Sequence, residues 1–215
     1  YTASQGLLLM IPNMYKIAAE QLPCVFHVSA RTVSTHALNI FGDHSDVMAC
    51  RQTGFAMLCE GNVQEVMDLS PVAHLAALSG KVPFINFFDG FRTSHEIQKI
   101  AVWDYKDLAD MCDMDAVKAF REHALNPEHP AMRGSHENGD TFFQHREACN
   151  QYYDALPEVV EKYMGKINEK LGTDYKLFNY YGAPDADRVI IAMGSICDVA
   201  EEVIDYLNAH GEKVG

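Results

Sequence analysis

The sequence lacks the paired cysteines that mark a structural zinc site or a locally encoded iron–sulfur cluster. Its six cysteines are widely spaced, and no two of them form a C-x-x-C pair. Dispersed cysteines in a chain of 215 residues are typical of reduced, buried thiols in a cytosolic protein. We therefore expect neither a disulfide framework nor a cluster-binding domain in this chain.

Basic residues are scarce, and long apolar runs are missing. The chain contains 17 Lys and Arg against 30 Asp and Glu, which gives a net charge of −13. This excess of acidic residues argues against a nucleic acid or an anionic membrane surface as a partner. The longest apolar run, residues 7–12, is far shorter than the roughly 20 residues that cross a bilayer. We expect no nucleic-acid partner and no membrane span.

Glycine-rich nucleotide motifs and the G-x-S-x-G motif of α/β-hydrolases are also missing. Gly194 and Ser195 follow an apolar segment and could bind a phosphate. Two residues are a weak signal, however, and a plain strand-to-helix turn explains them as well. The sequence therefore predicts neither a nucleotide-binding loop nor a hydrolase nucleophile.

Three short apolar segments predict strands at residues 25–30, 54–59 and 82–88, each buried on both faces. A helical pattern that is capped by Asn62 and ends at Gly80 separates the second segment from the third. Apolar strands that alternate with helices indicate an α/β fold, in which helices cover both faces of a parallel sheet.

Further helical patterns flank these strands. We expect one helix over residues 4–21, capped by Ser4 and kinked at Pro12. The remaining expected elements are helices at residues 104–111, 115–124, 157–171 and 198–209, a loop at 126–140, and a strand at 187–195.

Turn-like residues 182–185 precede the last expected strand and indicate a domain boundary between residues 176 and 184. We therefore divide the chain into a first domain, residues 1–176, and a partial second α/β domain, residues 177–215. Both ends cut through expected elements, so we expect the chain to be part of a longer protein.

Ligands of parallel α/β sheets bind beyond the carboxyl ends of the strands. The candidate loops are therefore residues 4–6, Arg31 and residues 88–92. An arginine directly after a buried strand needs an anionic partner, and its planar fork suits a substrate carboxylate. A structural ion pair with a nearby Asp or Glu is the alternative for Arg31.

A second candidate group contains His36, Asp43, His44 and Asp46, because imidazole and carboxylate groups can bind zinc or iron. A metal-dependent hydrolase built on His36, Asp43 and His44 is therefore one hypothesis. The eight-residue step from His36 to His44 does not match a helical ligand spacing. A loop that forms its own hydrogen bonds through Asp43 and Asp46 is favoured, and we assign no metal ligand.

Several longer strings resemble pyruvate:ferredoxin (flavodoxin) oxidoreductases, and together they cover essentially the whole chain. They are TASQGLLLMIPNMYK at 2–16, FGDHSD at 41–46, RQTGFAML at 51–58, FFDGFRTSHEIQK at 87–99, NPEHP at 126–130 and GAPD at 182–185. The resemblance is to most of the N-terminal pyrimidine-binding domain, residues 1–176, and to the start of the following transketolase-C-terminal-like domain, residues 177–215.

The resemblance implies part of a cytoplasmic, homodimeric enzyme that converts pyruvate and coenzyme A to acetyl-CoA and CO2 and passes electrons to ferredoxin or flavodoxin. The family uses thiamine diphosphate with Mg²⁺ and carries iron–sulfur clusters. The diphosphate-binding part and every cluster-bearing domain would lie outside this chain. A non-catalytic binding or assembly module of a related 2-oxoacid oxidoreductase is the alternative function.

The resemblance also implies roles for individual residues. Arg31, in the string HVSAR at residues 27–31, matches the family arginine that pairs with the pyruvate carboxylate. Asp43 and His44 would lie at the rim of the same cleft. The family glutamate that bonds the cofactor's aminopyrimidine lies upstream of Tyr1, so no catalytic residue is certain in this segment.

Overall fold

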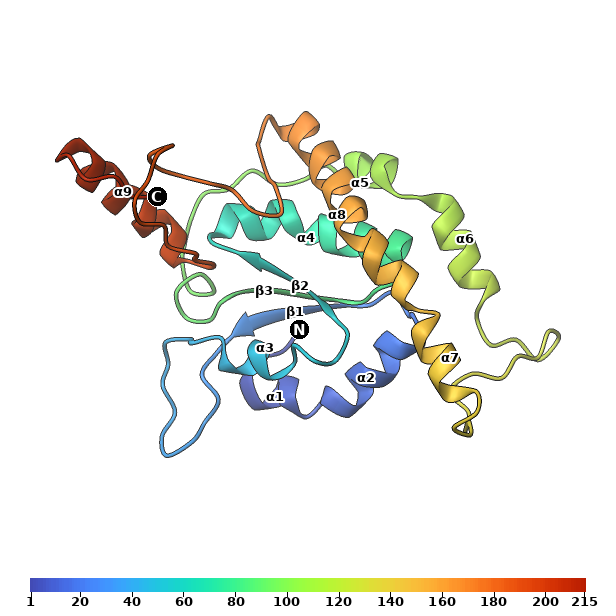
Figure 1. The fold of residues 1–215 in the computed structure, drawn as a ribbon. Helices are drawn as coiled ribbons and strands as arrows, with labels where there is room; N and C mark the ends of the chain where they lie inside the picture. The colour runs from blue at the N-terminus through green and yellow to red at the C-terminus, as the bar shows by residue number, and fades with distance from the viewer.

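A computed structural model describes residues 1–215 and shows a three-stranded sheet at the centre of the molecule (Figure 1). The strands are β1 (Val25–Ala30), β2 (Ala56–Glu60) and β3 (Phe84–Asp89). They lie in the order β1-β3-β2, and both pairings are parallel. Because all three strands point the same way, their carboxyl ends meet at one edge of the sheet.

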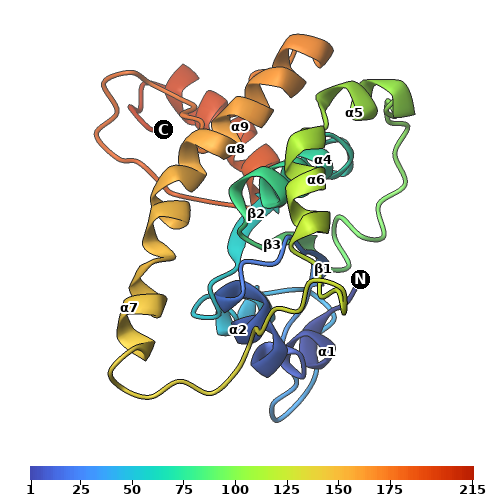
Figure 2. The same cartoon turned by 90° about the vertical axis from the view of Figure 1, so that its right-hand side faces the viewer.

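Helices cover both faces of this sheet. On one face lie α4 (Val63–Gly80) and α8 (Asn150–Leu171), and on the other lie α1 (Ser4–Leu8), α2 (Ile11–Ala19) and α3 (Ser45–Ala49) (Figures 1 and 2). Each face has its own core of buried apolar side chains. The predicted fold class, a parallel sheet covered on both faces, is confirmed.

The expectation that every strand is buried on both faces is wrong for two of the three. In β3 the first four residues are buried, whereas most residues of β1 and β2 are only half-buried. The difference follows from the strand order, because β3 is the central strand and β1 and β2 lie at the edges. One further parallel bridge joins Thr2 to Val28 on the outer side of β1.

The helix expected over residues 4–21 is two helices, α1 and α2, separated at Leu9 and Met10. Pro12 is the second residue of α2 rather than the centre of a kink, and at that position its missing N–H costs no hydrogen bond. Ser4 is the first residue of α1 and not its cap, and its N–H donates to Asp46.

The second half of the chain adds α5 (Tyr105–Met111), α6 (Met114–Glu122), α7 (Phe142–Glu147) and α9 (Ile196–Ala209). Helix α8 begins at Asn150, earlier than expected, and contains Pro157 within it. The hydroxyl of Tyr153 donates to the Gly54 carbonyl at 2.8 Å, which fixes the turns before the proline.

The strand expected at residues 187–195 is not formed. Only one bridge, between Arg188 and Val214, occurs there, and Val189 to Ile191 are exposed. A strand needs a neighbour for its hydrogen bonds, and the backbone bonds of this segment are to residues 213–215. The boundary between residues 176 and 184 stays a prediction. No helix combines the length and apolarity needed to cross a membrane.

Candidate functional site

The carboxyl-end edge of the sheet brings together the segments that the sequence analysis selected. Arg31 follows β1, Gly61 follows β2, and Asp89 is the last residue of β3. The start of α1 at Ser4 reaches the same edge through its hydrogen bond to Asp46. These segments are far apart in the sequence and adjacent in the fold, which is the arrangement in which parallel sheets bind ligands.

Arg31 is half-buried, and its guanidinium has no carboxylate within ion-pair distance. The alternative role, a structural ion pair, is therefore not what the structure shows. The Arg31 backbone N–H donates to Asp46 Oδ2 at 3.0 Å. The main chain of Arg31 is thus bonded, while its charged group has no internal partner.

Asp46 is completely buried and uses both carboxyl oxygens. Its Oδ2 accepts from the N–H groups of Ser4 and Arg31, at 2.8 and 3.0 Å, and its Oδ1 accepts from Val47 N–H at 2.7 Å. Asp43 makes only a local bond, from Ser45 N–H at 2.9 Å. The expected self-bonded loop therefore exists at Asp43, whereas Asp46 joins two more distant segments.

His44, a predicted rim residue, contacts Asp89, which lies in the candidate loop at residues 88–92. His44 Nε2 bonds Asp89 Oδ1, and Asp89 Oδ2 accepts from the N–H of Ser195 at 2.9 Å and from the Ser195 hydroxyl. Burial alone raises the pKa of Asp89, but the bonds from His44 and Ser195 outweigh it and lower the pKa to about 2. The same contact with Asp89 raises the pKa of His44 against the effect of burial.

This group is not a nucleophilic triad. Asp89 lies between His44 and Ser195, so the histidine bonds the aspartate and no imidazole accepts a proton from the serine hydroxyl. Gly194 has a φ of +83°, and a Cβ there would lie 2.8 Å from Asp89 Oδ1. The turn that could have bound a phosphate therefore binds the protein's own carboxylate.

The hypothesis of a metal-dependent hydrolase has no structural support. His36 is exposed, and its one side-chain contact is with Thr35 at 3.4 Å. His44 faces Asp89 instead of His36. Across residues 1–215, no three His, Cys, Asp or Glu side chains gather in a way that could hold a metal ion.

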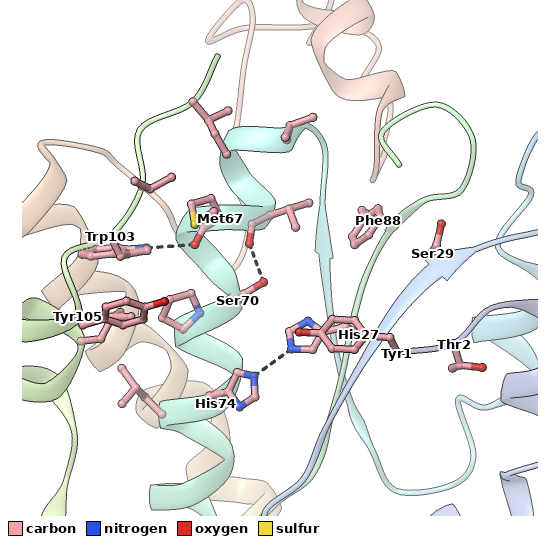
Figure 3. Close-up of a pocket in the computed structure, with 17 residues that line it drawn as sticks. Tyr1, Thr2, His27, Ser29, Met67, Ser70, His74, Phe88, Trp103 and Tyr105 are labelled. Atoms are coloured by element: carbon pink, nitrogen blue, oxygen red, sulfur yellow. Dashed lines mark hydrogen bonds between the residues drawn. The ribbon is translucent and has the colours of Figure 1, made fainter. Parts of the chain in front are cut away.

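A cavity of about 880 Å³ lies between β1 and α4 (Figure 3). Its wall includes His27 of β1 and His74 of α4, whose Nε2 atoms are 2.9 Å apart. The Tyr1 ring stacks on His27, and Trp103 and Phe88 supply apolar surface. Burial lowers the pKa of both histidines, and the proximity of His74 lowers the pKa of His27 further. Sequence reasoning missed this pair, because its two members are 47 residues apart and no local spacing brings them together.

A buried carboxyl group lies on the same face of the sheet. Glu60, the last residue of β2, is fully buried, and neither of its carboxyl oxygens has a hydrogen-bond partner. Burial, with the nearby charge of Glu65, holds the pKa of Glu60 well above its usual range. Asn86 Oδ1 is buried and unpartnered too, while the Asn86 amide nitrogen donates to His27 and Ser70.

Comparison with known proteins agrees with this architecture. The family model described as "Pyruvate flavodoxin/ferredoxin oxidoreductase, thiamine diP-bdg" matches residues 1–165. A solved structure of 2-oxoglutarate:ferredoxin oxidoreductase from Magnetococcus marinus, with 2-oxoglutarate, coenzyme A and succinyl-CoA bound, superposes with a TM-score of 0.56. It aligns with 99% of this chain and 39% of its own, at 18% identity, and so shows the fold alone.

Curated relatives align with the whole chain, and two of them illustrate the similarity. Over 215 residues it is 66% identical to the pyruvate-flavodoxin oxidoreductase of Enterobacter agglomerans and 64% identical to the pyruvate:ferredoxin oxidoreductase of Moorella thermoacetica. The chain spans 18% of the length of each of these relatives. The resemblance found in the sequence is confirmed, and the chain belongs to the pyruvate flavodoxin/ferredoxin oxidoreductase family.

Proposed function

We propose that the protein containing this chain oxidises pyruvate. The carbon–carbon bond between its carboxylate and keto carbons breaks, CO2 leaves, and the acetyl group forms a thioester with coenzyme A. One proton and two electrons are released, and ferredoxin or flavodoxin accepts the electrons. The observation that carries this proposal is 66% identity along all 215 residues to a pyruvate-flavodoxin oxidoreductase.

Within that reaction, Arg31 binds the carboxylate of pyruvate. It follows β1 at the edge where parallel sheets bind ligands, and no Asp or Glu neutralises its guanidinium. Two parallel N–H bonds from the guanidinium would fix the carboxylate and so orient the keto carbon. Asp43 and His44 lie in the neighbouring loop and form the rim of the same site.

Thiamine diphosphate with Mg²⁺ is the proposed cofactor, and when bound it would supply the nucleophilic carbon for the decarboxylation. Mg²⁺ needs several oxygen ligands, and residues 1–215 contain no cluster that could provide them. The residues present fit the carboxylate end of the substrate and not the metal-diphosphate end of the cofactor. We therefore assign the metal-diphosphate site and the iron–sulfur clusters to other parts of the protein.

The remaining partners are proposals of the same kind. Coenzyme A is the acyl acceptor, the protein is a homodimer, and it acts in the cytoplasm. Six free cysteines, none of them in a disulfide, support a reducing compartment.

The experiment compares Arg31→Ala and Arg31→Lys in the full-length protein, with Arg121→Ala as a control on an exposed arginine of α6. Arg31→Ala is expected to lower kcat/KM for pyruvate by an amount that corresponds to ~2–4 kcal/mol of lost transition-state stabilisation. Arg31→Lys should lose nearly as much, because lysine keeps the charge without the paired N–H geometry. Normal kcat/KM in Arg31→Ala would refute the proposed carboxylate contact.

A further inference from the structure

The peptide group between Ala30 and Arg31 is bonded at both of its polar atoms. The Ala30 carbonyl accepts from Gly90 N–H at 2.7 Å, and the Arg31 N–H donates to Asp46 Oδ2 at 3.0 Å. A Cβ at Gly42 would lie 2.5 Å from the Ala30 oxygen, and one at Gly90 would lie closer still. This peptide therefore has two bonds that oppose its rotation and two glycines that enclose its oxygen.

Asp46 supplies the acceptor for the Arg31 N–H. Its carboxylate is fully buried, and every donor it receives is a backbone N–H, from Ser4, Arg31 and Val47. Charge-assisted bonds of this kind are shorter and stronger than neutral ones. One side chain thus joins the start of α1, the end of β1 and the start of α3.

The residues after Arg31 are tied to the same region. Thr32 Oγ1 donates to the Phe41 carbonyl at 2.8 Å, and Val33 N–H donates to Ser45 Oγ at 2.8 Å. The main chain on both sides of Arg31 is therefore bonded, while its guanidinium has no ion-pair partner. A charged group on a fixed backbone is preorganised for a ligand of opposite charge.

We propose that Asp46 is a positioning residue for substrate binding: it fixes the Ala30–Arg31 peptide, and the fixed peptide sets where the Arg31 guanidinium meets a carboxylate. The inference rests on the proposed function, in which Arg31 binds pyruvate. Paired N–H bonds tolerate only small errors of position and angle, so a mobile backbone at Arg31 would weaken them. Asp46 itself touches neither substrate nor cofactor in this role.

The test is a double-mutant cycle in the full-length protein, with Asp46→Asn, Arg31→Ala and the double variant. The asparagine side chain has a single, neutral carbonyl oxygen. If its amide faces Val47 N–H, the Arg31 N–H keeps only a weaker neutral acceptor, and if its amide faces Ser4 and Arg31, both of those bonds are lost. Asp46→Asn is expected to raise KM for pyruvate by about 10- to 100-fold, with a smaller change in kcat. In the Arg31→Ala background the same substitution should have no further effect on KM.

The control is Asp113→Asn at the start of α6, where an aspartate also accepts two backbone N–H bonds, at 3.1 and 3.0 Å. It should leave KM unchanged. Circular dichroism and thermal melting verify that each variant is folded. If Asp46→Asn yields no folded protein, Asp46→Glu replaces it in the cycle, because the longer side chain keeps the charged acceptor but moves it away from the Arg31 N–H.

The outcomes separate the two proposals. If Arg31→Ala raises KM and Asp46→Asn does not, the positioning role is overturned and the carboxylate contact stands. If Asp46→Asn raises KM equally in both backgrounds, Asp46 acts through the fold in general, which also overturns the positioning role. An unchanged KM in Arg31→Ala would overturn both proposals together.

Discussion

Asp89 and Ser195 are joined by two hydrogen bonds, from the backbone N–H and from the hydroxyl of the serine, although 106 residues separate them. The second carboxyl oxygen of Asp89 bonds His44, 45 residues earlier in the chain. One side chain at the end of the central strand therefore connects the loop before α3 to the start of α9. Removing it should loosen both segments.

Asp89→Asn is expected to lower the local stability of the α9 start by about 1–3 kcal/mol, because Ser195 and His44 lose the charged carboxylate to which they bond. Hydrogen–deuterium exchange of residues 195–200 in the full-length protein measures this. The pKa of Asp89 is depressed to about 2 in the folded protein. Its contribution to the free energy of unfolding is therefore present above its unfolded pKa of about 3.8 and is lost as pH falls toward 2.

The pKa of His44 is raised in the folded protein. Its contribution to the free energy of unfolding is therefore present below its unfolded pKa of about 6.5 and is lost as pH rises through the folded pKa. The protection difference between wild type and Asp89→Asn should therefore be larger at pH 5.5 than at pH 8.5. Equal differences at the two pH values would contradict a charged His44–Asp89 pair.

The His27–His74 pair predicts the opposite pH dependence. Burial lowers the pKa of both histidines, so the unfolded segment binds protons more readily, and stability is lost as pH falls through about 6.5. Protection of residues 69–76 should drop from pH 7.5 to pH 5.5 in wild type and drop less in His74→Asn. His129→Asn, on an exposed loop, is the matched control and should behave as wild type.

Gly90→Ala should disrupt the end of β1, because the new methyl group would overlap the Ala30 carbonyl, a backbone atom that cannot move freely. Overpacking of this kind costs about 1–3 kcal/mol. Gly139→Ala places its Cβ in open space and should be tolerated. Thermal inactivation of the two full-length variants distinguishes them, and equal midpoints would show that the peptide at Ala30 can relax.

Glu60→Gln should stabilise the protein at neutral pH. Burial raises the pKa of Glu60, so above pH 4.5 the unfolded state ionises first and the folded state loses stability as pH rises. Glutamine has the same shape and cannot ionise, so it removes this loss of stability at high pH. The thermal midpoint of Glu60→Gln should exceed that of wild type, by more at pH 8.5 than at pH 6. A lower midpoint at pH 8.5 would mean that Glu60 is ionised and paired.

The 215 residues alone should not bind thiamine diphosphate with useful affinity, because they contain no cluster of ligands for the Mg²⁺ that accompanies the diphosphate. Isothermal titration of the folded fragment with thiamine diphosphate and Mg²⁺ should give no saturable signal, while the full-length protein serves as the positive control. A saturable 1:1 isotherm in the micromolar range would disprove this prediction.

The sequence predicted the sheet better than the contacts at its edge. Continuous apolar runs identified β1, β2 and β3, because burial in a parallel sheet leaves that pattern. The same pattern failed at residues 187–195, where apolar side chains are exposed and no partner strand lies alongside. An apolar pattern shows that a segment could be buried, but it does not show which other segment would pack against it.

Arg31 could be selected from its position after a strand, but Asp46 and Asp89 could not be paired with their donors. Apart from Val47, their partners are 15 to 106 residues away, and no local spacing encodes such contacts. The His27–His74 contact could not be predicted either. Its two members belong to β1 and α4 and come together only because the helix packs against the strand.

The separation of Asp89 and Ser195 along the chain also determines which contacts of Asp89 can form first during synthesis. A ribosome adds about 5–20 residues per second, so the 106 additions that lead from Asp89 to Ser195 take on the order of 5–20 s. His44 and the three strands have all been made by the time Asp89 appears, so the aspartate can pair with His44 long before Ser195 exists. The order of synthesis therefore lets the start of α9 dock onto a carboxylate that the histidine can already hold in place.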